Sequence, residues 1–315
     1  DGVEAKDQYS WRWTPEGNLV GEEVLAVRNA VGLVEMTPMT KFEVSGPNAA
    51  RWMDRLIANR LPSVGKVTLA HHLTANGGVQ AEYMVARLGE DLFYLISTPR
   101  AERWNFDDLS RLLLADGSVS LRNVTNDRGC FTVVGPKARE VLQPLTEIDL
   151  SNESFPWFGV KTGSVALASD VRLVRVNYEG ELGWELYHPL PYQRQLLDAI
   201  LREGEKHGMR LVGLHALESL RLEKSYRAMY RDMNPELNAL ESGLERFIRL
   251  DKGDFVGRDA VLKYKERNDQ RRSVTLRIDT DGASTFANEG LYSDGKLVGR
   301  ITSGGYGYAV GHDVA

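Results

Sequence analysis

Cysteine is nearly absent from this chain of 315 residues, since Cys130 is the only one. A single cysteine excludes an internal disulfide and any cysteine-built metal site, and it favours a reducing compartment. We interpret Cys130 as a buried strand residue. The sequence also has no apolar run near the roughly 20 residues that a membrane span needs. Its first residues, 1–4, have neither the basic nor the apolar segment of a secretion signal. We therefore expect a protein that neither is secreted nor enters a membrane, and that resides in the cytoplasm or, in a eukaryote, in the mitochondrial matrix.

Runs of positive charge are missing as well. The net charge is −5, which argues against nucleic acid as a partner because phosphate binding needs a basic face. The six histidines show no metal-ligand spacing, and the neighbours His71 and His72 would point to opposite faces of a strand. We predict no metal site. No glycine-rich phosphate loop joins a strand to a helix, and no serine or cysteine sits in a nucleophile elbow. What remains is a set of acids near glycine turns and aromatic residues: Glu82, Glu181, Glu185 and Glu223.

The stretch 178–187, Tyr-Glu-Gly-Glu-Leu-Gly-Trp-Glu-Leu-Tyr, has the composition of a ligand site. Before it, residues 171–176 alternate apolar and cationic side chains, which predicts a strand with one buried face. Glu185 follows a double-glycine turn beside Trp184 and Tyr187. A carboxylate there could accept two parallel hydrogen bonds from a flat heterocycle with an amino group and a ring N–H. The alternative is a β-hairpin with a solvated acidic tip.

A strand–turn–helix unit occurs twice in the sequence. Residues 42–56 and 131–145 share Phe, Val, Gly, Pro, Ala and a final Leu at equal spacing. In both, a Gly-Pro turn follows the strand, and proline suits the first turn of a helix. An internal repeat of this kind predicts two related α+β halves that face each other.

Between the two copies, the pattern predicts a hairpin. Residues 66–73 form one strand, Asn76-Gly77-Gly78 the turn, and 79–88 the returning strand. Alternation places Glu82 on the face opposite to its apolar neighbours in the strand. Beyond about residue 271, short strands with tight turns predict a small β domain. We expect helices over 22–30, 103–114, 192–207 and 212–230, the last one broken near its end.

Together, these pieces resemble the folate-binding T-protein (aminomethyltransferase) family and, within it, the C-terminal folate domain of dimethylglycine and sarcosine dehydrogenases. The likeness covers nearly the whole chain, and ordered motifs are far more specific together than any one alone. The segments that carry the resemblance are 32–36, 42–47, 77–82, 178–185, 220–224, 240–244 and 302–306.

The resemblance implies an α+β fold with three lobes around a central tetrahydrofolate site. Residues 1–268 would form the folate-binding region, two interlocked α+β subdomains of which one is inserted at about 41–130. Residues 269–315 would form a C-terminal β-barrel-like domain, and relatives continue with further strands of that barrel.

The resemblance also implies roles for individual residues. Glu185 matches the acid that grips the pterin ring, and Tyr178 matches an aromatic residue of the same pocket, to which Met36 and Arg221 are also assigned. Glu82 matches the catalytic carboxylate near the folate nitrogens, which is usually an aspartate. The alternative for Glu82 is a solvated strand acid.

Two departures from the family pattern bear on function. Leu217 stands where stand-alone aminomethyltransferases usually have an arginine, as in the dehydrogenase-linked branch. A folate-binding iron–sulfur assembly factor has a cysteine where this chain has Asp254, so that relative's working residue is missing here.

We therefore predict transfer of a methylene from a methylated glycine derivative to tetrahydrofolate, giving 5,10-methylenetetrahydrofolate. FAD is expected only if an upstream domain or a partner flavin-dependent dehydrogenase supplies it. One alternative is methyl transfer from a sulfonium or aryl-ether donor to give 5-methyltetrahydrofolate, and another is a non-catalytic folate-binding or assembly module.

Overall fold

The computed structural model describes residues 16–280 and 283–315. The expectation about a secretion signal depends on residues that lie outside this part of the chain. None of the helices in these ranges combines the length and apolar character that a membrane crossing requires. Short 3-10 turns occur at Pro99–Ala101, Thr125–Asp127, Gln143–Leu145, Leu190–Tyr192 and Glu245–Phe247.

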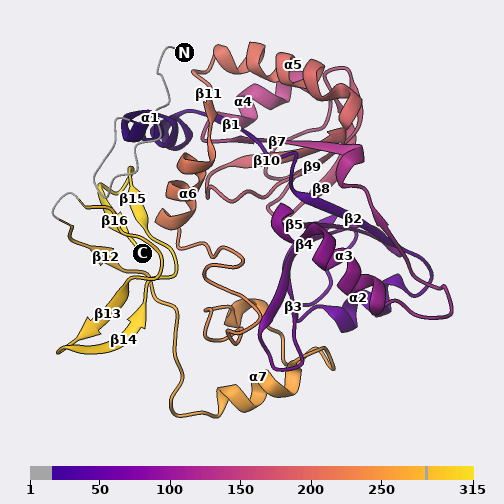
Figure 1. Ribbon diagram of the computed structural model, residues 1–315. Coiled ribbons are helices and arrows are strands. Elements are labelled where there is room, and N and C mark those ends of the chain that lie inside the picture. The colour runs from indigo at the N-terminus through magenta and orange to yellow at the C-terminus, as the bar shows by residue number, and fades with distance from the viewer. Residues whose placement is uncertain (1–15, 281–282) are drawn as a thin grey trace.

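A six-stranded sheet forms the upper part of the molecule in Figure 1. Its order is β11 (Arg210–Val212), β1 (Gly32–Glu35), β7 (Arg128–Val134), β10 (Gly183–Pro189), β9 (Ala168–Val174) and β8 (Val160–Val165). Only β1 and β11 pair in parallel. Apolar side chains of α4 (Ala138–Leu142) and α5 (Gln193–Glu205) join one core cluster with this sheet. A separate cluster joins it to α1 (Glu16–Asn29) and α6 (Leu214–Glu223).

A five-stranded antiparallel sheet forms the second layer. Its order is β3 (Lys66–Leu73), β4 (Val79–Gly89), β5 (Leu92–Ser97), β2 (Thr40–Ser45) and β6 (Ser120–Asn123). Its outer face packs on α2 (Ala49–Leu56) and α3 (Glu102–Arg111). The sheet is built from residues 40–123, inside the segment predicted as an insert, although its status as a separate domain stays a prediction.

The inner faces of the two sheets pack against each other. Tyr94 and Ala86 of the five-stranded sheet share one buried cluster with Cys130 and Tyr187 of the six-stranded sheet. Cys130 is fully buried in β7, as predicted. The backbone also links the two edges, since Val160 donates to the carbonyl of Gly65 at 2.9 Å.

The predicted internal repeat is confirmed in the backbone geometry. Gly46 and Gly135 have φ values of 122° and 132°, a region that side chains rarely enter. A Cβ at Gly46 would lie 2.4 Å from the carbonyl oxygen of Ser118, and one at Gly135 would lie 2.5 Å from that of Ala30. Both units therefore need glycine for the same reason, which is the close approach of another backbone segment.

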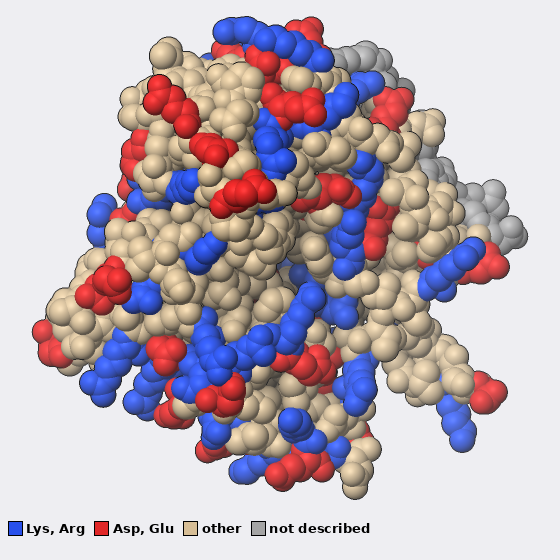
Figure 2. Space-filling model, turned by 180° about the vertical axis from the view of Figure 1, so that it is seen from behind, with Lys and Arg blue, Asp and Glu red and all other residues tan. Residues whose placement is uncertain are grey.

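The C-terminal part forms two small antiparallel sheets rather than a closed barrel in the described residues. One contains β12 (Arg277–Ile278), β16 (His312–Val314) and β15 (Gly305–Gly307), and the other pairs β13 (Gly290–Ser293) with β14 (Lys296–Arg300). The β15 strand packs beside α6, and α7 (Arg258–Lys265) precedes this region along the chain. Seen from behind, Asp and Glu lie among Lys and Arg, so neither charge covers this face (Figure 2).

Two predictions about local structure need correction. The segment 212–230 is expected to be a helix broken near its end, but α6 already ends at Glu223, and the chain beyond it turns around the buried side chain of Arg221. The cationic side of the 171–176 strand is not solvated. Arg172 is buried there because it stacks 4.3 Å from the centre of the Tyr94 ring and bonds to Glu43 at 2.6 Å across the two sheets.

Candidate functional site

Glu82 forms a pair with His71 on neighbouring strands of the five-stranded sheet. The carboxylate Oε2 of Glu82 lies 3.0 Å from Nε2 of His71, which is fully buried, whereas the Glu82 side chain is 24% exposed. The His71 ring also contacts Phe247, with ring centres 5.6 Å apart. One carboxylate oxygen is thus held in place, and the other makes no hydrogen bond to the described residues. Such a carboxyl group is oriented and accessible to a ligand.

Glu185 and Tyr187 form a second pair, on the six-stranded sheet. They lie two residues apart on one face of β10, and the Tyr187 hydroxyl donates to Glu185 Oε2 at 2.5 Å. Trp184, which was predicted beside them, points into the core on the opposite face. Glu185 has no ion-pair partner among the described residues. It therefore keeps acceptor capacity for a ligand that donates hydrogen bonds.

The surroundings of Glu185 favour its neutral form. Burial raises the pKa of Glu185 from 4.5 to about 8, and the charge of nearby Glu179 adds to the rise, while the Tyr187 hydrogen bond opposes it. Glu179 is itself 1% exposed, and burial raises its pKa to about 7. Two carboxyl groups close together in a dry environment cannot both carry charge at low cost. A ligand that donates hydrogen bonds to Glu185 would therefore stabilise its charged form.

The two pairs lie on sheet faces that look toward each other. Glu82 has the same strand parity as Ala86, and Glu185 the same as Tyr187. Ala86 and Tyr187 meet in the buried cluster between the sheets. The sequence-predicted acids Glu82 and Glu185 therefore both face the space between the two layers.

Tyr178 lies beside this space, in the turn that precedes β10. Its hydroxyl donates to the Arg227 carbonyl at 2.7 Å, and its ring stacks on Tyr226 at 6.0 Å and 25°. Burial raises the pKa of Tyr178 well above its usual range, and the charge of Glu82 adds to the rise while that of Arg221 lowers it. Tyr178 is therefore close enough to Glu82 and Arg221 for their charges to affect its ionisation.

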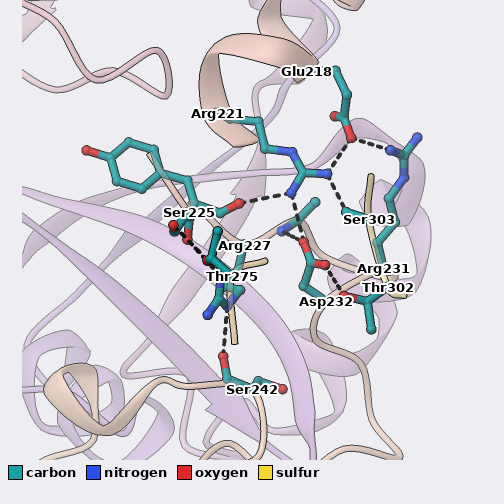
Figure 3. Close-up of polar contacts among 12 residues, drawn as sticks. Glu218, Arg221, Ser225, Arg227, Arg231, Asp232, Ser242, Thr275, Thr302 and Ser303 are labelled. Carbon is teal, nitrogen blue, oxygen red and sulfur yellow. Dashed lines mark hydrogen bonds and ion pairs between the residues drawn. The ribbon is translucent and has the colours of Figure 1, made fainter. Parts of the chain in front are cut away.

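Arg221 is almost fully buried and connects three segments (Figure 3). Its guanidinium donates to Asp232 at 2.9 Å, to the Ser303 hydroxyl at 2.8 Å and to Glu218. A fourth bond, 3.0 Å long, reaches the Tyr226 carbonyl. The pKa of Arg221 is raised by these partners against the effect of burial. The structure thus places Arg221 as the link between α6, the following turn and the C-terminal sheets, and its direct contact with a ligand stays a prediction.

Met36 lies just after β1 and is half-buried. It packs against the cluster between the sheets and also against the cluster around α1 and α6. Its N–H donates to the Cys130 carbonyl at 2.9 Å, which fixes the chain where β1 ends. Met36 can present a flexible apolar side chain to a planar ligand.

Sequence reasoning did not assign a role to His71. The hairpin pattern points to the partner strand, but simple counting back from the turn pairs His71 with Ala81. A β-bulge between His72 and Leu73 shifts the register by one and brings His71 opposite Glu82. As predicted, His72 faces the other way, with Nδ1 3.4 Å from Asp108 of α3. Sequence reasoning also missed Glu179, whose position between Tyr178 and a glycine turn was the available signal.

Within the ranges 16–280 and 283–315, no group of three or more His, Cys, Asp or Glu side chains is placed to hold a metal ion.

Comparison with known proteins gives a consistent assignment. Residues 2–252 match the GCVT N-terminal domain, and residues 271–315 match the glycine cleavage T-protein C-terminal barrel domain. The chain is 36% identical to human mitochondrial dimethylglycine dehydrogenase over 100% of its own length but only 36% of that protein's. It is 29% identical to an aminomethyltransferase of Thermoanaerobacter sp. (strain X514), over 95% of this chain and 80% of that one.

Among solved structures, the fold is similar to glycine cleavage system aminomethyltransferase T from Bartonella henselae. The TM-score is 0.85 at 24% sequence identity, and the match covers 94% of this chain and 80% of that chain. The chain spans about a third of the length of the dimethylglycine dehydrogenases that it matches. By its domains and its fold, the chain belongs to the glycine cleavage T-protein (aminomethyltransferase) family.

Proposed function

We propose that this chain binds tetrahydrofolate between its two sheets and transfers a one-carbon unit to it. The observation that carries the proposal is the pair of facing carboxyl groups, Glu185 without a cationic partner and Glu82 held by His71. Family membership and the similarity to an aminomethyltransferase support the same ligand.

Glu185 is the group that fits the pterin ring. A pterin edge offers an amino group and a ring N–H side by side, and a carboxylate accepts both in parallel. Partial burial disfavours the charged form of Glu185, so a ligand that donates two hydrogen bonds to it offsets part of that cost. Tyr187 fixes the orientation of the carboxyl group, and Met36 and Tyr178 supply apolar and aromatic contact in the proposed pocket.

Glu82 is the group that fits the reacting end. The net step forms two C–N bonds between the donor carbon and folate nitrogens N5 and N10, breaks the donor C–N bond, and leaves both nitrogen protons on the departing amine. Glu82 would take a proton from a folate nitrogen and hold it for the amine, while its negative charge stabilises the cationic donor. His71 keeps the carboxylate in the orientation that this transfer needs.

The donor that we propose is an iminium ion derived from a methylated glycine such as dimethylglycine or sarcosine. Forming it removes two electrons from the amine, and a flavin-dependent dehydrogenase domain or partner would accept them. Support comes from relatives named dimethylglycine dehydrogenase, sarcosine dehydrogenase and 4-methylaminobutanoate oxidase (formaldehyde-forming), each matched over about a third of its length.

Titration calorimetry with tetrahydrofolate under anaerobic, reducing conditions tests the binding half of the proposal. Saturable binding that Glu185→Ala abolishes or strongly weakens is the expected result. Formation of 5,10-methylenetetrahydrofolate from an iminium donor, lost in Glu82→Gln, tests the transfer half. A folded protein that binds no folate would contradict the whole proposal, and a 5-methyl product would contradict the choice of donor.

A further inference from the structure

A separate cavity of about 350 Å³ opens where the segment after β5 meets the segment that follows α6. It is lined by Arg100, Ala101, Trp104, Tyr230 and Pro235. Arg100 and Ala101 belong to the 3-10 turn that joins β5 to α3, and Trp104 lies in the first turn of α3. Tyr230 and Pro235 belong to the segment that follows α6. Two parts of the chain that are more than a hundred residues apart thus form one opening.

The cavity is tied to the strand that carries Glu82. Ser97, three residues before Arg100, donates its hydroxyl to the Glu82 carbonyl at 2.8 Å. On the other side, Pro235 packs so closely on Gly78 that a Cβ there would lie 1.8 Å from the Pro235 carbonyl oxygen. Gly78 directly precedes β4. Both walls of the cavity are therefore anchored within four residues of Glu82.

The lining combines one cation with two aromatic side chains. Arg100 has no ion-pair partner among the described residues, and its charge acts on Tyr230, whose pKa it lowers against the effect of burial. Trp104 is 66% exposed, so its ring is accessible to a ligand in the cavity. Tyr230 has a φ of 66°, a strained value for a residue with a side chain.

These features match one class of small molecule. An unpaired guanidinium binds a carboxylate in bidentate fashion, and aromatic faces attract an alkylated ammonium or iminium group. A molecule that carries both groups a few ångströms apart is an N-methylated amino acid. The glutamate tail of folate fits less well, because it has two carboxylates and no cation.

We infer that Arg100, Trp104 and Tyr230 form the donor subsite, with Arg100 binding the donor carboxylate and the two aromatic rings contacting its methylated nitrogen. This inference deepens the proposed function and depends on it. It makes Arg100 a specificity determinant, since a donor without a carboxylate would lose its main contact.

The test measures binding of N,N-dimethylglycine, as a stable mimic of the iminium donor, by ligand-observed NMR with tetrahydrofolate present. Trimethylamine and acetate are the half-molecule probes. We expect dimethylglycine to bind more tightly than either half. Arg100→Gln should weaken dimethylglycine about tenfold, to the level of trimethylamine, because it removes a charge-assisted contact at a partly solvated site. Trp104→Leu should weaken both cationic probes about threefold.

Arg103→Gln is the matched control, since Arg103 lies three residues further along the chain, in α3, with its side chain 95% exposed, and does not line the cavity. Equal effects of the Arg100 and Arg103 changes would overturn the subsite. So would loss of tetrahydrofolate affinity in Arg100→Gln with dimethylglycine binding unchanged, because Arg100 would then serve the folate tail. Calorimetry with tetrahydrofolate distinguishes failure of the donor subsite from failure of the proposed function. Folate binding without dimethylglycine binding overturns the subsite alone, whereas no folate binding at all removes the proposed function and the subsite with it.

Discussion

Glu82 and Glu185 occupy comparable places in the two sheets and differ in their partners. Each lies on an inner face, and each has one oxygen held by a neighbouring ring. The partner of Glu82 is the imidazole of His71, and Glu82 keeps 24% of its side chain exposed. The partner of Glu185 is the phenol of Tyr187, and burial raises the pKa of Glu185 to about 8.

This difference separates two tasks that one residue type can perform. A carboxylate beside an imidazole and open to a ligand can exchange a proton during a reaction. A carboxyl group in a dry site, without a cation, gains most from a ligand that brings two hydrogen-bond donors. We therefore propose proton transfer for Glu82 and ligand binding for Glu185.

The largest effect is expected for Glu82→Gln. Turnover should fall about 10²–10⁴-fold, because the amide cannot accept the proton, while tetrahydrofolate affinity stays within a factor of about three. Product formation and calorimetry measure the two quantities. Glu90→Gln is the control, since Glu90 follows the same strand with its side chain 85% exposed. A loss of affinity equal to the loss of turnover would remove the division between the two acids.

Glu185→Ala should have the opposite profile. We expect tetrahydrofolate binding to weaken by about 2–3 kcal/mol, from the loss of charge-assisted hydrogen bonds in a buried site. Turnover at saturating folate should change much less. Calorimetry gives the affinity, and Glu181→Gln in the same turn is the control. An unchanged affinity would exclude Glu185 from the binding site.

A smaller effect is expected for His71→Gln. Glutamine can still donate to Glu82, but it lacks the rigid ring that orients the carboxylate, so turnover should fall about tenfold with folate affinity kept. His72→Gln serves as the control because His72 faces α3 instead. Equal turnover in the two variants would show that His71 does not act on Glu82.

A proton linkage is also expected at Glu185. The pKa of Glu185 is about 8 when folded and about 4.5 in an exposed chain. The folded state then binds more protons between these values, so the free energy of unfolding should fall as pH rises from about 4.5 to about 8. Folate binding should release close to one proton near pH 7, and calorimetry in buffers of different ionisation enthalpy measures it. Glu185→Gln should abolish the release, and an equal release in that variant would assign the proton to another group.

Much of the fold could be predicted because local patterns control it. The hairpin of β3 and β4, the burial of Cys130 and the two Gly-Pro units follow from alternation, turn residues and spacing. The end of α6 was predicted only approximately, because the hydrogen bonds of Arg221 to the Tyr226 carbonyl and to Asp232 fix where the chain turns. One prediction failed where a distant segment decides. Arg172 is buried because the second sheet covers it.

The sequence by itself determined which residues carry carboxyl groups, on which face of a strand each lies, and that two similar units form the frame. Those properties depend on neighbours along the chain. Only the tertiary structure decided that Glu82 pairs with His71, since a single bulge sets that register. It also decided that Glu185 lies in a dry site and that Arg100 and Tyr230 line one cavity. Register, burial and cavities depend on contacts between segments far apart in sequence, and no local pattern encodes them.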